Sequence, residues 1–313
     1  MKALGRVAVS LSLTFLMVAC GCGGDKKNAA QTAPVAPPPA SLPAGSTLAG
    51  NWLITPSAPT SSFLLGDTSS DHVRLALTFD VTGDNIVAGG FTNHFCGTGV
   101  SLSVSSALSG TVAQDGSFNL QSKTGLPASS SITGKAPDSQ GSPWSGTYTL
   151  TFTGFPSGLT QSCDETVSSS FTATYLPLVS GVYTGTATPM SSLPSESSTV
   201  GPITVELTLQ QGGTATDVVS GKTISGNGVL TGSIKVQGSP CFTTGTTTGG
   251  LSNVVGNRIQ AMFAMNDGSF LAIVGTVADP AEMRIATSSI RVSSPCGSTS
   301  PVLYFLSELD KQM

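Results

Sequence analysis

The residues Ile203-Thr204-Val205-Glu206-Leu207-Thr208-Leu209 alternate between apolar and polar side chains. The stretch Val73-Arg74-Leu75-Ala76-Leu77-Thr78-Phe79 begins 130 residues earlier and has a similar alternation. A period of two puts every second side chain on the same face of a β-strand, so each stretch predicts a strand with one buried face. The two stretches indicate β-structure in both halves of the chain.

The composition also favours an all-β protein. Charged residues make up 10% of the 313 residues, and the chain contains 37 glycines and 19 prolines. Low charge, frequent β-branched residues and abundant turn formers are typical of strands joined by short loops. The net charge is −4 and no basic patch is present, so nucleic acid is not expected to be a partner.

Turn signals such as Gly83-Asp84-Asn85 and Asp115-Gly116 divide the first half into short segments. The predicted strands of this half are 50–55, 73–81, 86–95, 100–112, 117–123, 130–135, 144–154 and 166–176. Seven or eight strands at short spacing predict a barrel or a sandwich. We expect two tandem antiparallel β-domains, each a barrel-like meander or, as the second choice, an immunoglobulin-like sandwich. The polar tail 307–313 is expected to be frayed.

The two halves resemble each other, which suggests an internal repeat. Ala49-Gly50-Asn51-Trp52 and Ser180-Gly181-Val182-Tyr183 share a small-Gly-x-aromatic start, offset by 131 residues. Each half also contains an Asp-Gly-Ser-Phe turn, at 115–118 and 267–270. Duplication predicts domains at 48–178 and 179–313. Chance similarity in a chain rich in Gly, Ser and Thr is the alternative.

The N-terminus has the features of an export signal. Lys2 and Arg6 precede an apolar stretch at 7–18, which is too short for a span of about 20 apolar residues. The following Leu16-Met17-Val18-Ala19-Cys20 resembles the lipobox of bacterial lipoprotein signals. The resemblance implies a signal peptide at 1–19, cleavage before Cys20 and acyl chains on that cysteine. A plain secretory signal is the alternative.

Acylated Cys20 would hold the protein to a lipid bilayer, since each buried methylene contributes about 0.8 kcal/mol. Gly21 follows the cysteine where the enterobacterial sorting rule would place Asp for inner-membrane retention, which favours the outer membrane. Residues 20–47 are rich in Pro, Ala and Gly and are expected to form an extended tether. Cys22 has no assigned role.

Four further cysteines suggest disulfides. The repeat selects Cys96–Cys163 and Cys241–Cys296, each pair within its own half. In the chain-entropy model, a disulfide that closes a loop of this size stabilises the folded state by about 4 kcal/mol. Such disulfides form in an oxidising compartment. The body contains no Cys-x-x-Cys pattern, so no metal site is expected.

Catalytic motifs are missing from the sequence, so we do not expect an enzyme or a cofactor. There are only 2 His, and Gly154-Phe155-Pro156-Ser157-Gly158 places its serine wrongly for a nucleophile elbow. Trp52 and Trp144 are the only tryptophans; they would either fill a core or line a ligand site. The Gly-x-Trp start also bears a weak likeness to lipocalin- and avidin-type barrels.

These observations lead to three hypotheses for an exported, membrane-anchored protein of the cell envelope. The first is a non-catalytic binding or structural module, whose hydroxyl-rich strands at 101–105 and 243–248 contact an envelope protein or a glycan. The second is a carrier of a small apolar ligand in a β-barrel. A hydrolase with paired carboxylates is the third and the least favoured.

Overall fold

The structure is a computed structural model of the full chain. It describes residues 45–57, 73–96, 100–122, 128–152, 165–189, 201–279, 284–293, 303–306 and 308–312. The chain divides into two units, Met1–Ser41 and Leu42–Met313, and both barrels described below belong to the second unit. Among the described residues, no helix has the length and apolarity that crossing a bilayer requires.

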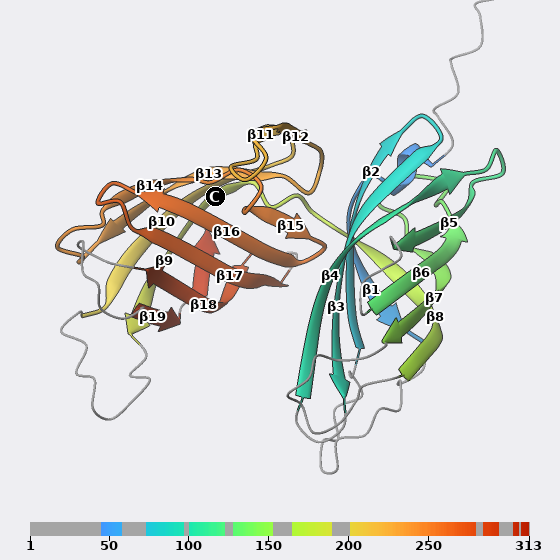
Figure 1. The fold of residues 1–313 in the computed structure, drawn as a ribbon, viewed down its shortest axis with the longest axis horizontal. Helices are drawn as coiled ribbons and strands as arrows, with labels where there is room; N and C mark the ends of the chain where they lie inside the picture. The colour runs from blue at the N-terminus through green and yellow to red at the C-terminus, as the bar shows by residue number, and fades with distance from the viewer. Residues whose placement is uncertain are drawn as a thin grey trace, which may run out of the picture. The chain divides into compact units, whose positions relative to one another are not determined.

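The first eight strands form a closed antiparallel barrel in which each strand pairs with its neighbours in sequence and β8 pairs with β1. The 3-10 turn η1 (Ser46–Leu48) precedes β1 (Figure 1). The strands are β1 (Gly50–Pro56), β2 (Val73–Thr82), β3 (Asn85–Cys96), β4 (Val100–Val112), β5 (Ser117–Ser122), β6 (Ala128–Lys135), β7 (Trp144–Phe152) and β8 (Glu165–Leu176). The predicted all-β meander is confirmed, and it is a barrel and not a sandwich.

The second sheet also returns on itself. Pairing runs from β10 through β13, β14, β16, β17 and β18 to β19 and β20, which pair with β9, and β9 pairs with β10. Its strands are β9 (Gly181–Pro189), β10 (Ile203–Gln211), β13 (Leu230–Gln237), β14 (Thr244–Thr247), β15 (Asn253–Val255), β16 (Arg258–Met265), β17 (Phe270–Asp279), β18 (Arg284–Ser293), β19 (Leu303–Leu306) and β20 (Glu308–Lys311). A separate hairpin joins β11 (Thr214–Thr216) and β12 (Thr223–Ser225).

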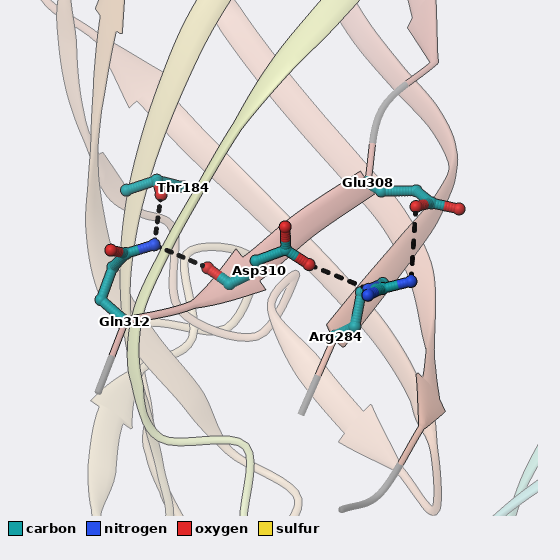
Figure 2. Close-up of polar contacts among 5 residues, drawn as sticks. All are labelled: Thr184, Arg284, Glu308, Asp310 and Gln312. Carbon is teal, nitrogen blue, oxygen red and sulfur yellow. Dashed lines mark hydrogen bonds and ion pairs between the residues drawn. The ribbon is translucent and has the colours of Figure 1, made fainter. Parts of the chain in front are cut away.

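The prediction that the C-terminal tail is frayed is wrong, because β20 completes the second barrel. Leu309 is fully buried in the core, and its neighbours pair with β18 and β9. On the exposed side Arg284 Nε donates to Asp310 Oδ1 at 2.9 Å, and Gln312 Nε2 donates to Thr184 Oγ1 at 2.5 Å (Figure 2). One buried apolar residue is thus enough for this polar tail to form a strand, because both neighbouring strands supply backbone hydrogen-bond partners.

The starts of the two barrels match in detail. Gly50 and Gly181 open β1 and β9 with φ of 114° and 140°, a backbone region that glycine adopts without strain. Two residues later Trp52 and Tyr183 are each fully buried. The predicted small-Gly-x-aromatic correspondence therefore has the same conformation and the same buried aromatic position in both barrels.

The two Asp-Gly-Ser-Phe turns, in contrast, are not equivalent positions of a repeat. Asp115 lies between the fourth and fifth strands of its barrel, whereas Asp267 lies between the fifth and sixth. Phe118 is buried in the core, while Phe270 is 46% exposed. In both turns the aspartate Oδ1 accepts hydrogen bonds from the backbone N–H and the hydroxyl of the serine two residues on. The shared motif therefore reflects local turn chemistry.

A buried polar cluster, here called the barrel joint, connects the two barrels; it comprises Asn51, Thr78, Asp80, Gln211, Asn227 and Gly256. Its centre is a reciprocal amide pair. Asn51 Nδ2 donates to Gln211 Oε1 at 2.9 Å, and Gln211 Nε2 donates to Asn51 Oδ1 at 2.7 Å. Gln211 Oε1 also accepts from the N–H of Val179, and its Nε2 donates to the carbonyl of Asn227. Both amides are thus fully paired, as buried polar groups must be.

Further contacts extend the joint over β1 and β2. The Thr78 hydroxyl donates to Asn51 Oδ1 at 2.8 Å and accepts from the N–H of Gly256 at 2.9 Å. The N–H of Asn227 donates to Asp80 Oδ1 at 2.5 Å, and burial raises the pKa of that carboxyl above its ordinary value. A Cβ on Gly256 would lie 2.9 Å from the carbonyl oxygen of Trp52. The close approach of the β15–β16 turn therefore requires glycine.

Candidate functional site

The interior of the first barrel is filled by aromatic side chains near the end where β7 begins. The Trp144 ring makes edge-to-face contacts with Trp52, Phe118 and Phe171 at centroid distances of 5.9, 5.4 and 5.2 Å. Phe79 is 6.0 Å from the same ring. Such pairs contribute about 0.5–1.5 kcal/mol each beyond their buried area. This aromatic plug, defined as Trp52, Phe79, Phe118, Trp144 and Phe171, closes one end of the barrel.

Glycines on the inner face make room for the plug. A Cβ on Gly134 would lie 2.9 Å from the Trp144 ring and 3.0 Å from the Phe118 ring. A Cβ on Gly146 would lie 2.8 Å from the Phe171 ring. Below the plug, Trp52 Nε1 donates to the carbonyl of Leu48 in η1 at 2.7 Å. The aromatic plug and η1 therefore fill one end of the barrel, which carries the turns at 83–84, 113–116 and 136–143.

Above the plug, the inward-facing residues are a mixture of aliphatic and hydroxyl side chains. Here we call them the upper interior; they are Leu120, Ser122, Ile132, Tyr148, Leu150, Val167 and Ser169. Tyr148 lies directly opposite Ser169 in the register of β7 and β8 and packs on Phe171. The Ser122 hydroxyl accepts from the N–H of Ser130, and the Ser169 hydroxyl donates to the carbonyl of Ser170. Both serines are thus engaged with backbone.

Among the described residues of this barrel, two buried hydrogen-bond donors have no partner: the Tyr148 hydroxyl and Trp144 Nε1. Tyr148 is 1% exposed and Trp144 is 5% exposed. Burial raises the pKa of Tyr148, so the phenol is neutral and keeps its proton. Leaving a buried donor unpaired costs about 1–3 kcal/mol. An interior that tolerates two such groups is a candidate for binding a ligand that pairs with them.

The second barrel has a more uniform core. Its buried inward-facing residues are aliphatic side chains together with Phe242, Phe263, Met265 and Tyr183. The Tyr183 hydroxyl is buried without a partner, and burial raises the pKa of Tyr183 to about 12. This single orphan hydroxyl lies at the position that corresponds to Trp52 of the first barrel. The comparison favours the first barrel as the binding element.

A second candidate surface covers the outer face of β6, β7 and β8. The outward rows of these strands are serine and threonine, apart from Lys135 at the end of β6 and Leu176 at the end of β8. Neighbouring hydroxyls pair across the strands: Thr133 with Thr147 at 2.7 Å, Thr149 with Ser168 at 2.9 Å, and Thr151 with Thr166 at 3.3 Å. This outer hydroxyl face resembles in kind the surface that the sequence predicts for 101–105, whose side chains lie outside the described residues. In 243–248, the hydroxyls of Thr247 and Thr248 bond to backbone.

The structure brings the two predicted ligand-lining tryptophans together. Trp52 and Trp144 both belong to the aromatic plug, and only Trp144 has an unpaired N–H. Cys241 packs against the core of the second barrel and is disulfide-bonded. The structure does not describe the predicted partner Cys296, nor Cys163, Cys20 and Cys22, and it does not describe the side chain of Cys96. The disulfide pairings and the lipidation therefore stay predictions.

Sequence reasoning missed Tyr148 and the barrel joint. Tyr148 shares the inward row of β7 with Trp144 and Leu150, so alternation alone would have found it. Gln211 ends the row Ile203, Val205, Leu207, Leu209, and a polar residue at a position of apolar period is a detectable signal. Asn51 gave no such signal, because it lies on the face opposite Trp52, where a polar residue is ordinary.

Taken with its fold, the candidate site defines this chain as an all-β protein with tandem barrels. Among the described residues, no group of three or more His, Cys, Asp or Glu is placed to hold a metal ion. No family model and no curated protein matches the chain. A crystal structure of a protein of unknown function from the DUF3598 family of Nostoc punctiforme is similar at 11% identity and a TM-score of 0.25. The match covers 86% of this chain and 98% of that chain, a likeness too weak to bear on function.

Proposed function

We propose that the protein is an exported, lipid-anchored carrier of the bacterial cell envelope whose first barrel binds a small, mostly apolar ligand. The observation that supports this best is the pair of unpaired donors, Tyr148 Oη and Trp144 Nε1, inside a closed barrel. An eight-stranded barrel has room for its own side chains or for one small ligand. The plug occupies one end, which leaves the upper interior for the ligand.

The anchor is the acylated Cys20 that the lipobox predicts, followed by the tether at 20–47. We place the protein on the outer membrane, with its two disulfides formed in an oxidising compartment. Replacing Cys20 tests this part separately: the Cys20→Ala chain should no longer be labelled by radioactive palmitate in cells. Labelling of this variant at the level of the unchanged protein would refute acylation at Cys20.

We propose that binding involves no catalysis and no cofactor. The support is the absence of a nucleophile elbow and of other catalytic motifs from the sequence. The Tyr148 phenol, with its raised pKa, serves as a neutral hydrogen-bond donor and not as a base.

Native mass spectrometry of the chain purified from an oxidising periplasm tests the carrier function. We expect a small-molecule adduct that is lost on denaturation and that is weaker in Tyr148→Phe. Tyr183→Phe, the same change at the orphan hydroxyl of the second barrel, is the matched control and should retain the adduct. A bare mass for the unchanged protein, with no binding of added apolar compounds, would refute the carrier function.

The outer hydroxyl face supports a second candidate, contact with a glycan of the envelope. Its paired, uncharged hydroxyls offer donors and acceptors at the regular spacing of neighbouring strands, about 4.8 Å. Co-sedimentation with isolated cell-wall polysaccharide tests it. Thr149→Val, which removes one hydroxyl from the middle of the face, should weaken binding if this surface is used, whereas retained binding would exclude it.

A further inference from the structure

The unpaired groups of the first barrel also indicate what kind of ligand it takes. We infer that the ligand is uncharged and carries a hydrogen-bond acceptor oxygen, such as a carbonyl or an ether, on an apolar frame. This inference rests on the proposed carrier function and goes beyond it by naming the chemical class.

Both unpaired groups are donors. The indole N–H of Trp144 can only donate, and the Tyr148 phenol keeps its proton. An acceptor oxygen on a ligand in the upper interior satisfies the Tyr148 hydroxyl. A hydrocarbon without polar atoms satisfies neither and leaves the cost of the buried donor unrelieved. The hydroxyls of Ser122 and Ser169 bond to backbone, and neither accepts a hydrogen bond from Tyr148 or Trp144, since both donors are without a partner.

In the part of the chain that the structure describes, the buried polar side chains are Asn51, Thr78, Ser122, Gln211, Ser252 and Ser269, and none of them is charged. Burying an isolated carboxylate or ammonium without a partner is strongly unfavourable. An ionised head group beside the described residues of the upper interior would meet only neutral dipoles. These residues therefore favour a neutral acceptor over a carboxylate.

The strands above the plug bound the size of the ligand. On β7, the strand end at Phe152 lies four positions beyond Tyr148. At about 3.3 Å per residue this is a depth of roughly 13 Å. Leu120, Ile132, Leu150 and Val167 give this region apolar walls. A bicyclic aromatic ketone has a suitable length and places its carbonyl at one end.

The test compares three compounds with the same bicyclic frame: acetylnaphthalene, ethylnaphthalene and naphthoate, all substituted at the same ring carbon. Binding is measured by equilibrium dialysis against residues 20–313 with Cys20→Ala, exported to an oxidising periplasm by a cleavable secretory signal in place of residues 1–19, so that no acyl chain competes. We expect the ketone to bind about fivefold to tenfold more tightly than the hydrocarbon, which corresponds to one buried hydrogen bond. Naphthoate should bind most weakly.

Tyr148→Phe assigns the difference to the phenol. In this variant the ketone should lose its advantage while ethylnaphthalene binds as before; Tyr183→Phe should leave all three affinities unchanged. If ketone and hydrocarbon bind equally, or if Tyr148→Phe weakens neither, the inferred ligand class is wrong although the carrier function stands. Tighter binding of naphthoate than of the ketone also overturns it. If none of the three binds, the carrier function itself fails, and the inference fails with it.

Discussion

Replacing Gln211 in the barrel joint should cost more free energy of unfolding than any nearby surface change. The Gln211 side chain makes four hydrogen bonds, two with Asn51, one with the N–H of Val179 and one with the carbonyl of Asn227. Each bond contributes about 1 kcal/mol, and truncation leaves its buried partners unpaired. Gln211→Ala should therefore lower the free energy of unfolding by about 4 kcal/mol.

A double-mutant cycle separates the amide pair from the rest of the joint. Asn51→Ala loses the two bonds to Gln211, one from Thr78 and a long one of 3.4 Å to the carbonyl of Pro177. The expected loss is about 3 kcal/mol. Because two bonds are common to both single variants, the double variant should be about 2 kcal/mol more stable than the sum of the two losses predicts.

Urea unfolding provides the assay, with two probes that see different parts of the protein. Trp52 and Trp144 are the only tryptophans and both lie in the first barrel, so tryptophan fluorescence reports on that barrel alone. Far-UV circular dichroism reports on both barrels. In the unchanged protein the two transitions should coincide, since the joint couples the barrels; in Gln211→Ala they should separate.

The neighbouring Gln210→Ala is the matched control, because Gln210 is exposed on the same strand and should change the stability by less than about 0.5 kcal/mol. Equal losses in the two variants, or a coupling energy near zero in the cycle, would refute the joint as an energetic unit. Transitions that fail to coincide in the unchanged protein would show that the barrels unfold independently.

Four further changes test other parts of the structure. Burial raises the pKa of Asp80, so the free energy of unfolding should decline as pH rises from about 3.8 through the raised value. Asp80→Asn should abolish this decline, as measured by urea unfolding between pH 3.5 and 6. The pKa of Tyr183 is raised to about 12 from 10.0, so the unchanged protein should lose about 2 kcal/mol relative to Tyr183→Phe as pH rises from 10 to 12, and parallel curves would contradict the assignment. Gly134→Ala should destabilise by about 1–3 kcal/mol in urea, because its Cβ would press on Trp144, whereas Gly201→Ala, where nothing lies within 4 Å, should be neutral. Leu309→Ala should cost about 3 kcal/mol by the same assay, and a loss below about 1 kcal/mol would show that β20 is dispensable.

Alternation in the sequence was enough to predict the fold of the first barrel. All eight predicted strands exist, and their ends differ from the observed ones by at most two residues. The pattern works here because sequential strands pair with each other, so each hairpin is locally encoded. Alternation could not decide between a barrel and a sandwich, since closure depends on β1 pairing with β8, more than a hundred residues away in the sequence.

The tail 307–313 shows where counting apolar residues fails. Among its described residues, 308–312, only Leu309 is buried, and composition alone predicts fraying. The strand forms because β9 and β18 present backbone partners on both sides and because the core has a place for one leucine. The rest of the fold creates the core position that Leu309 fills, so the residue pattern within the tail cannot predict it.

The candidate site was only partly predictable for a related reason. The two tryptophans stand out by their rarity, and their burial follows from ordinary core packing. Whether Trp144 and Tyr148 find hydrogen-bond partners depends on the residues opposite them in neighbouring strands, such as Ser169, whose hydroxyl turns to backbone. Whether a buried N–H or O–H group finds an acceptor depends on the assembled barrel, so the sequence alone does not predict it.

The same comparison explains why the two barrels should have different roles. Both start with a glycine and a buried aromatic residue, yet the first needs Gly134 and Gly146 to fit large rings beside one another, whereas the core of the second consists mainly of aliphatic residues. Trp144 and Tyr148 carry polar groups on their rings that need partners. In the proposed carrier, a ligand that supplies the missing acceptor stabilises the folded first barrel. The second barrel contacts β1 and β2 of its neighbour through the joint.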